Sequence, residues 1–200
     1  RVISPTFHIR ADYEHRDLPE YFDDETGDLI WQPDVYRQVA ELARLLGKSR
    51  VVDLGCGTGT KLDDLAGLEV IGADIGANLD EVRRRHPGGR FVDLDLGAPF
   101  DLPVAADELS GCLVMSSDVI EHLPDPSHLL AALGAAVAAG ASVVLSTPER
   151  ELTWGVDHMG PPPNVAHCRE WSLDEFVSLV SAEVAVPAAA HLVPSLTRSS

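Results

Sequence analysis

Two segments of the 200-residue sequence combine residue types and spacing that could do chemistry. The first contains three glycines, Gly55, Gly57 and Gly59. Glycines between a strand and a helix let the backbone approach a ligand where a side chain would collide. The second holds Asp118 with Glu121 and His122 at i+3 and i+4, spacings that share one face of a helical turn. Two carboxylates and an imidazole can bind a divalent cation or transfer a proton.

A third acidic position, Asp74, indicates what the glycine segment binds. It lies 21 residues after Asp53, at the end of the next predicted strand, where a carboxylate can accept both hydroxyl protons of a ribose. A dinucleotide site requires Gly or Ala where this chain has Thr60, and the Gly-Lys-Ser/Thr of a phosphate-binding loop is absent. Asp53 would repel a pyrophosphate but suits a sulfonium and an amino group. The segment therefore predicts a cationic cofactor that contains a nucleoside.

Hydrophobic runs of strand length alternate with helical patterns, which predicts a parallel sheet flanked by helices. The expected helix 33–46 places Val35, Val39, Leu42, Leu45 and Leu46 on one face. The expected strands span 50–54, 69–73, 90–92, 109–115 and 141–146. The later helices are expected at 78–85 and from 127 to about 139, and a capping box at 172–175 opens a last helix. The predicted fold class is α/β, a Rossmann-like, doubly wound, mostly parallel sheet of the seven-stranded type with helices on both faces.

We expect one domain from residue 33 to residue 200, preceded by a segment, 1–32, that could cover the cofactor or substrate. Residues 147–171 are rich in Gly, Pro and His and are expected to form an irregular substrate loop. Residues 183–193 are expected to supply one or two edge strands.

The net charge of −17 argues against two classes of partner. Nucleic acids and anionic membranes both require clustered cations, so a small hydroxylated molecule is the expected partner. The three cysteines lie far apart, which argues against a disulfide framework and favours a reducing cytoplasm. The first residues are too polar for a signal peptide, and the uncharged stretch 129–145 is too short for a membrane span. Oligomeric state stays open.

From about residue 35 to residue 190 the chain resembles the class I S-adenosylmethionine-dependent methyltransferases. The resemblance rests on Val51–Gly59, Asp74, the Asp93/Asp95 segment and 118–126. It implies that S-adenosylmethionine binds with its methionine end at Asp53, its ribose at Asp74 and its adenine beside Asp95 or Asp93, with Ser116 or Ser117 near the sulfonium. The implied cofactor-binding residues are Asp53, Gly55, Cys56, Gly57, Asp74, Ile75, Asp95, Leu96 and Ser116.

A narrower resemblance involves 118–122 and 167–176, which are similar to the metal-ligand segments of small-RNA terminal 2′-O-methyltransferases. It implies that Asp118, Glu121, His122 and His167 bind a divalent metal such as Mg, Mn, Fe or Zn. Asp118 stands where that family has Glu, which shortens the reach by one methylene. The Glu-His-Leu-Pro-Asp-Pro pattern also resembles quinone-pathway O-methyltransferases, and Gly160–Asn164 resembles bacterial enzymes of sugar and glycan biosynthesis.

The roles of Glu121 and His122 remain open at this stage. His122 could be a general base, with Glu121 beside it in the catalytic site, or a metal ligand, or the pair could simply cap a turn before Pro124. The preferred function is O-methylation of a sugar or a glycosylated natural product. The alternatives are metal-dependent 2′-O-methylation of a terminal RNA ribose, and S-adenosylmethionine binding without catalysis.

Overall fold

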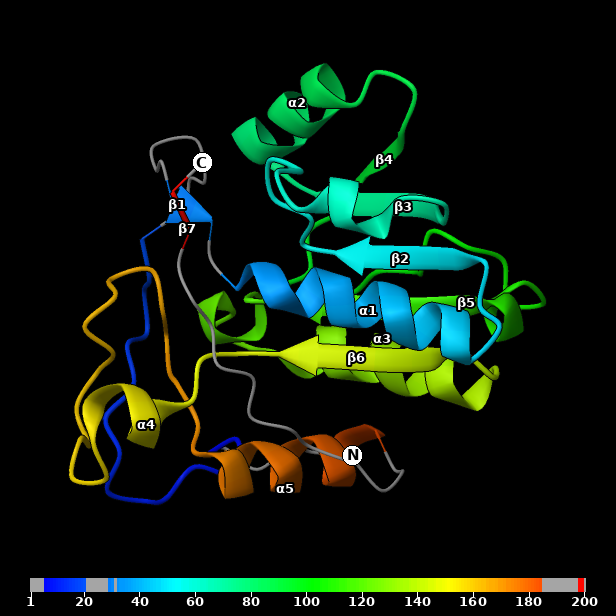
Figure 1. Cartoon of the computed structure of the whole chain (residues 1–200). Helices are drawn as coiled ribbons and strands as arrows, with labels where there is room; N and C mark the ends of the chain where they lie inside the picture. Colours follow the sequence, from blue (N-terminus) through cyan, green and yellow to red (C-terminus); the bar gives the residue numbers. More distant parts are fainter. Residues whose placement is uncertain (1–5, 21–28, 31, 185–197, 200) are drawn as a thin grey trace.

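The computed structural model describes residues 6–20, 29–30, 32–184 and 198–199, and its centre is a five-stranded parallel sheet (Figure 1). The sheet order is β4-β3-β2-β5-β6, formed by Arg90–Asp93, Glu69–Asp74, Arg50–Leu54, Cys112–Ser117 and Ser142–Ser146. The α-helices are α1 Pro33–Leu45, α2 Gly76–Arg85, α3 Ser127–Ala138, α4 Arg150–Trp154 and α5 Leu173–Val184. A separate antiparallel pair joins β1, Leu29–Ile30, to β7, Arg198–Ser199.

The order of the strands fixes where a ligand can bind. From β2 the chain adds β3 and β4 on one side, then returns to place β5 and β6 on the other. Such a reversal opens a crevice beyond the carboxyl ends of the two central strands. In this chain those ends are Leu54, which leads into the glycine segment, and Ser117, which leads into the acidic turn. The topology therefore brings the two segments selected from the sequence to one edge.

Both faces of the sheet are covered by helices, which explains the continuous apolar strands. In β2, Val51 packs in a cluster with residues of α1 and α2, whereas Val52 packs with residues of α3 and α5. Figure 1 shows α1 crossing one face of the strands. Strands buried on both sides are predominantly apolar on both faces, so they lack the alternation of a half-exposed strand.

Helix α1 is confirmed, but its predicted buried face is wrong at the C-terminal end. Val35 and Val39 are buried together with Tyr36, Ala40 and Ala43, whereas Leu45 is 83% exposed and Leu46 is 49% exposed. The buried stripe advances by three or four residues per turn and reaches Ala43 near the end of the helix. Leu45 therefore lies on the opposite side.

Other boundaries differ from expectation in instructive ways. The strand predicted at 109–115 runs instead from Cys112 to Ser117, because Leu109–Gly111 form a 3₁₀ turn. The segment expected to be irregular contains helix α4, which Glu149 caps by accepting a hydrogen bond from the backbone N–H of Leu152.

The predicted capping box opens α5 as expected. The backbone N–H of Ser172 donates to Glu175 Oε2, and the backbone N–H of Glu175 donates to Ser172 Oγ.

The strand number also differs from the seven-stranded type. The main sheet has five strands within the described residues, and all of them are parallel. The edge strands expected at 183–193 fall almost entirely on residues 185–197, outside the described residues. None of the helices in the described part of the chain has the length and hydropathy needed to cross a membrane.

Candidate functional site

The glycine segment forms a tight turn that a second carboxylate organises. Gly55, Gly57 and Gly59 have φ values of +87°, +55° and +77°, in the left-handed region that side chains disfavour. Asp74, at the end of β3, accepts hydrogen bonds from the backbone N–H of Gly57 and of Ile75, both at 2.8 Å. A carboxylate has about four acceptor positions, so Asp74 can also accept the two hydroxyls of a ribose.

Asp53 lies on β2 immediately before the glycines and is fully buried. The Tyr36 hydroxyl donates to its Oδ2 at 2.8 Å, and among the described residues Oδ1 has no hydrogen-bond partner. Burial raises the pKa of Asp53 to about 7, although the Tyr36 hydrogen bond and the charge of Lys61 act in the opposite direction. A cation placed beside this carboxylate would restore its ionised form.

The remaining residues that the sequence places at the cofactor, Cys56, Asp95, Leu96 and Ser116, differ in how they are held. Cys56 is buried in the turn. Asp95 lies just beyond β4, is exposed, and accepts a hydrogen bond from the backbone N–H of Gly97, while its neighbour Leu96 is buried. The hydroxyl of Ser116 donates to the carbonyl of Leu54 at 2.8 Å, so it connects the two central strands.

Gly55 is also the point where two turns touch. The first is the glycine turn 51–59, which we name the cofactor turn after the ligand expected there, and the second is the acidic turn 118–122. A Cβ added to Gly55 would lie 2.3 Å from Cγ2 of Val119, far inside van der Waals contact. Only glycine lets the backbone following β2 pack against the side chain following β5 at this distance. The two segments identified from the sequence are therefore in direct contact.

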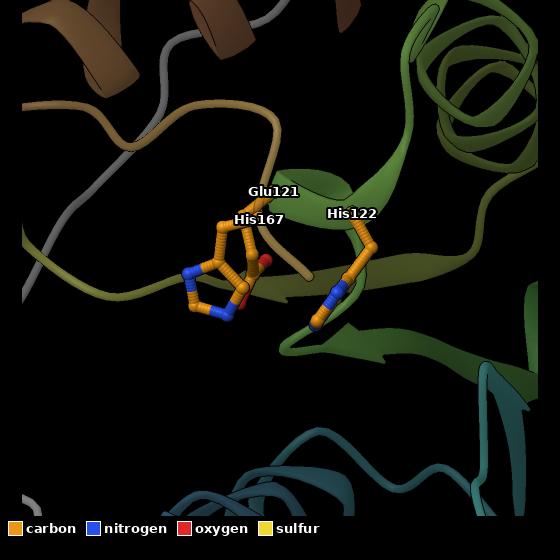
Figure 2. Close-up of side chains that lie close together, drawn as sticks. All are labelled: Glu121, His122 and His167. Carbon is orange, nitrogen blue, oxygen red and sulfur yellow. The ribbon is translucent and has the colours of Figure 1, made fainter. Parts of the chain in front are cut away.

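Beyond Val119 lies a group that we name the acid–histidine cluster: Glu121, His122 and His167. Glu121 and His122 belong to the 3₁₀ turn Ile120–His122, and His167 comes from the loop that precedes α5 (Figure 2). One potential ligand atom from each side chain lies within 4.8 Å of the other two. The rings of His122 and His167 meet edge to face, with their centroids 4.6 Å apart.

Hydrogen bonds determine which atoms of the cluster can accept a proton or bind a cation. Nδ1 of His122 is 2.8 Å from the carbonyl of Ala166, which can only accept, so this nitrogen carries the proton and Nε2 is the ring's acceptor atom. Thr147 donates to Glu121 Oε2 at 3.1 Å, and no described residue donates to Glu121 Oε1.

Burial favours the neutral forms of two members of the cluster, Glu121 and His122. Glu121 is fully buried, and desolvation together with the nearby charge of Asp118 raises its pKa well above the usual range. Burial, followed by the proximity of His167, lowers the pKa of His122 to about 4. A neutral imidazole is the form that binds a metal. A cation bound beside a buried carboxylate that has an unsatisfied oxygen would offset the desolvation cost of the ionised form.

Asp118, the fourth predicted ligand, is not part of this group of three. It follows β5 with a φ of +56°, a left-handed conformation that Asp tolerates better than most residues. Its charge acts on Glu121, as the raised pKa of Glu121 shows. The structure thus brings three of the four predicted ligands together.

The N-terminal segment 6–20 runs alongside the loop that carries His167 (Figure 1). Arg16 is the main connection, because its guanidinium donates to the carbonyls of Pro162, Asn164 and His167. The backbone N–H of Glu14 donates to the carbonyl of Met159 in the same way.

Sequence reasoning missed four residues that support the cluster: Arg16, Thr147, Asn164 and Glu170. Glu170 had a detectable signal, since it lies three residues after His167. Asn164 lies three residues before His167 in the same loop, whereas Arg16 and Thr147 depend on contacts between distant segments.

Comparison with known proteins identifies relatives of this architecture. A family model described as "Methyltransferase domain" matches residues 31–183. The ubiquinone biosynthesis O-methyltransferase of Thiobacillus denitrificans is 35% identical over 118 residues, which are 57% of this chain and 50% of that protein. The enzyme of the same name from Hahella chejuensis is 35% identical over 116 residues, 56% of this chain and 48% of that protein. The chain thus spans about half the length of these curated relatives.

Among solved structures, the methyltransferase domain of bacterial-CtHen1-C superposes with a TM-score of 0.56 at 22% identity, covering 76% of this chain and 82% of that one. At this level of identity the likeness concerns the fold.

Proposed function

Since the chain belongs to the methyltransferase-domain family, we propose that it transfers the methyl group of S-adenosylmethionine to a hydroxyl oxygen of a small polar metabolite, a sugar or a glycosylated natural product. The observation that carries the proposal is the contact between Gly55 and Val119. It joins a turn suited to a cationic nucleoside to a cluster that can bind or deprotonate a hydroxyl. A methyl donor and an oxygen acceptor held at one sheet edge can react by in-line displacement.

Each part of the site has a defined task in this reaction. Asp53 attracts the charged methionine end, Asp74 accepts the ribose hydroxyls, and Asp95 with Leu96 borders the adenine. Rate acceleration then comes chiefly from holding the acceptor oxygen and the methyl carbon in near-attack geometry, which can supply about 7–11 kcal/mol. The acceptor hydroxyl must lose its proton as the new C–O bond forms.

The acid–histidine cluster suits a divalent metal. It combines an unsatisfied buried carboxylate oxygen with two imidazoles, a donor set compatible with Zn, Fe or Mn. Donor atoms about 2.1 Å from one ion stand at most about 4.2 Å apart, which is close to the 4.8 Å within which the three ligand atoms lie. When bound, the metal acidifies a coordinated hydroxyl. The low pKa of His122 makes this imidazole a weak base at neutral pH and favours its role as a ligand.

The net charge of −17 supports a small acceptor over a polyanion. The relatives from Thiobacillus and Hahella carry an O-methyltransferase name, which favours oxygen as the attacking atom. A second candidate, 2′-O-methylation of a terminal RNA ribose, is favoured by one observation, the donor set of the cluster. Its substrate would meet a strongly acidic protein.

The decisive experiment measures cofactor binding, metal binding and methyl transfer on the same protein. Calorimetry with S-adenosylmethionine and with Mn²⁺ or Zn²⁺ is followed by radiolabelled methyl transfer to methyl glycosides, glycosylated phenols and short oligoribonucleotides, with and without chelator. We expect transfer to a hydroxylated small molecule. Transfer to oligoribonucleotides that chelator abolishes would identify the RNA alternative, and cofactor binding without transfer to any acceptor would favour a non-catalytic protein.

Two variants test the cofactor turn and the acid–histidine cluster separately. Asp74→Ala should lose cofactor affinity and keep metal binding. His122→Ala should keep cofactor affinity and lose both metal binding and turnover. Unchanged cofactor affinity in Asp74→Ala would overturn the assignment of the cofactor turn, and unchanged turnover in His122→Ala would remove the cluster from the reaction.

A further inference from the structure

Glu170 is a buried carboxylate to which the proposed reaction gives no task. It is 1% exposed, and both of its oxygens accept hydrogen bonds from aromatic N–H groups. Nδ1 of His167 is 2.6 Å from Oε1, and Nε1 of Trp154 is 2.6 Å from Oε2. Its backbone is held as well, since Arg150 donates to its carbonyl and its N–H donates to the hydroxyl of Tyr13. Two side chains therefore fix the carboxylate of Glu170, and two others fix its backbone.

The hydrogen bonds around His167 define which ring nitrogen carries the proton. The backbone N–H of Ala166 donates to Oδ1 of Asn164, which orients the amide so that Nδ2 faces Nε2 of His167 at 3.0 Å. An amide N–H₂ can only donate, so Nε2 is an acceptor and Nδ1 bears the proton. That proton is donated to Glu170, so the acceptor nitrogen Nε2 is on the opposite side of the ring.

We propose that Glu170 is a positioning residue that fixes His167 in the tautomer able to bind a divalent metal through Nε2. This inference rests on the proposed metal-binding role of the acid–histidine cluster. Histidine ligands in metal sites almost always donate their second N–H to a carboxylate or a carbonyl. His122 meets the same requirement through Ala166, so both imidazoles of the cluster have Nδ1 occupied and Nε2 as the acceptor.

Trp154 makes the proposal testable with one substitution. In Glu170→Gln the side chain keeps its size but has one acceptor oxygen and one N–H₂ group. The indole of Trp154 can only donate, so it takes the oxygen, and the N–H₂ group faces Nδ1 of His167. His167 then satisfies this contact by moving its proton to Nε2, because Asn164 is exposed and can turn toward water. A protonated Nε2 cannot bind a metal.

The same reasoning predicts a rescue. In Trp154→Phe/Glu170→Gln the indole donor is gone, so the glutamine oxygen can turn to His167 and accept from Nδ1 again. The metal-binding tautomer should return. Trp154→Phe alone keeps the carboxylate and serves as the matched control.

The experiment titrates Co²⁺ into the wild type and the three variants and follows visible absorption and calorimetric heat. We expect Glu170→Gln to bind Co²⁺ at least tenfold more weakly, the magnitude typical of losing such a supporting contact. Trp154→Phe and the double variant should stay within about threefold of the wild type. A double variant no better than Glu170→Gln would overturn the proposal, since general structural damage accumulates and is not reversed.

The tautomer itself is read without metal, from the ¹⁵N chemical shifts of the His167 ring. We expect the proton on Nδ1 in the wild type and the double variant, and on Nε2 in Glu170→Gln. If the wild type bound no Co²⁺, the proposed metal site would fail while this measurement still decided the role of Glu170. Identical shifts in the wild type and Glu170→Gln would overturn the inference.

Discussion

The cofactor turn and the acid–histidine cluster lie at the same sheet edge but are built in opposite ways. The turn is local, because it consists of nine consecutive residues and a single carboxylate, Asp74 of the adjacent strand, holds its backbone. The cluster joins Glu121 and His122 to a histidine 45 residues beyond His122, and it functions through side chains. Nδ1 of each imidazole forms a hydrogen bond with a group outside the cluster: the carbonyl of Ala166 for His122 and the carboxylate of Glu170 for His167.

This difference teaches where each region is vulnerable. The turn should be sensitive to any atom added to its backbone, and the cluster to any change in hydrogen-bonding capacity at constant size. Substitutions in the two regions can test this contrast.

Gly55→Ala should damage the turn most. The new Cβ would meet Val119 at 2.3 Å, and the residue would keep a φ of +87°. We expect S-adenosylmethionine affinity to fall at least ~100-fold by calorimetry, since clash and backbone strain together cost several kcal/mol. Gly67→Ala is the matched control: Gly67 has a φ of +85° with nothing within 4 Å of the added Cβ, so only stability should fall. Wild-type affinity in Gly55→Ala would show that the contact is not required.

Asp74→Asn should weaken S-adenosylmethionine binding by about tenfold to a hundredfold, because hydrogen bonds to a charged group contribute roughly 1.5–3 kcal/mol. Metal affinity at the acid–histidine cluster should not change, because the charge removed belongs to the other region. Calorimetric titration with Mn²⁺ checks this, and a parallel loss of metal binding would mean that the two regions are not independent.

The pH dependence of cofactor affinity should report Asp53. Its pKa of about 7 means that the neutral carboxyl must lose its proton when a cationic cofactor binds. Affinity should therefore increase about eightfold between pH 6 and pH 7.5. Asp53→Asn should remove this increase, and an unchanged slope in that variant would assign the titration to another group.

The raised pKa of Asp53 also makes the stability of the folded protein depend on pH, but stability decreases with rising pH whereas cofactor affinity increases. The folded protein binds the Asp53 proton more tightly than the unfolded chain does, so the contribution of Asp53 to stability falls as the pH rises from about 4 to about 7. Denaturant unfolding of the wild type and Asp53→Asn without cofactor measures this contribution. A wild-type stability that rose more steeply with pH than that of Asp53→Asn across this range would contradict the assignment.

Thr147→Val should have the smallest effect. The substitution removes the hydrogen bond to Glu121 Oε2 at nearly constant volume. We expect metal affinity to fall by about threefold to tenfold, from a loss of roughly 0.5–1.5 kcal/mol. Thr153→Val, which loses a hydroxyl on the exposed helix α4, is the control and should change nothing at the cluster.

The contrast between a local turn and a cluster of distant side chains explains which features could be predicted from the sequence. Glycine spacing and the acid at Asp74 encode a local backbone shape, so the turn, its strands and the α/β class followed from pattern alone. Helix α4 and the shifted start of β5 were missed because short turns depend on capping and tertiary contacts. Residues 121 and 122 were paired by helical spacing, whereas the loop that precedes α5 offered two histidines, His158 and His167, and a family resemblance selected His167. Glu170 and Asn164 each stand three residues from His167, which is a weak local signal, whereas the support from Thr147 depends on a contact between distant segments.

Arg16 has a consequence for how the site can evolve. Its guanidinium binds carbonyl oxygens at 162, 164 and 167, which every amino acid provides. Between these anchors, Pro163 and Val165 are exposed. The loop can therefore exchange these side chains over many generations while its path stays constant. The sequence of the loop can diverge in this way without the loop losing its attachment to the fold.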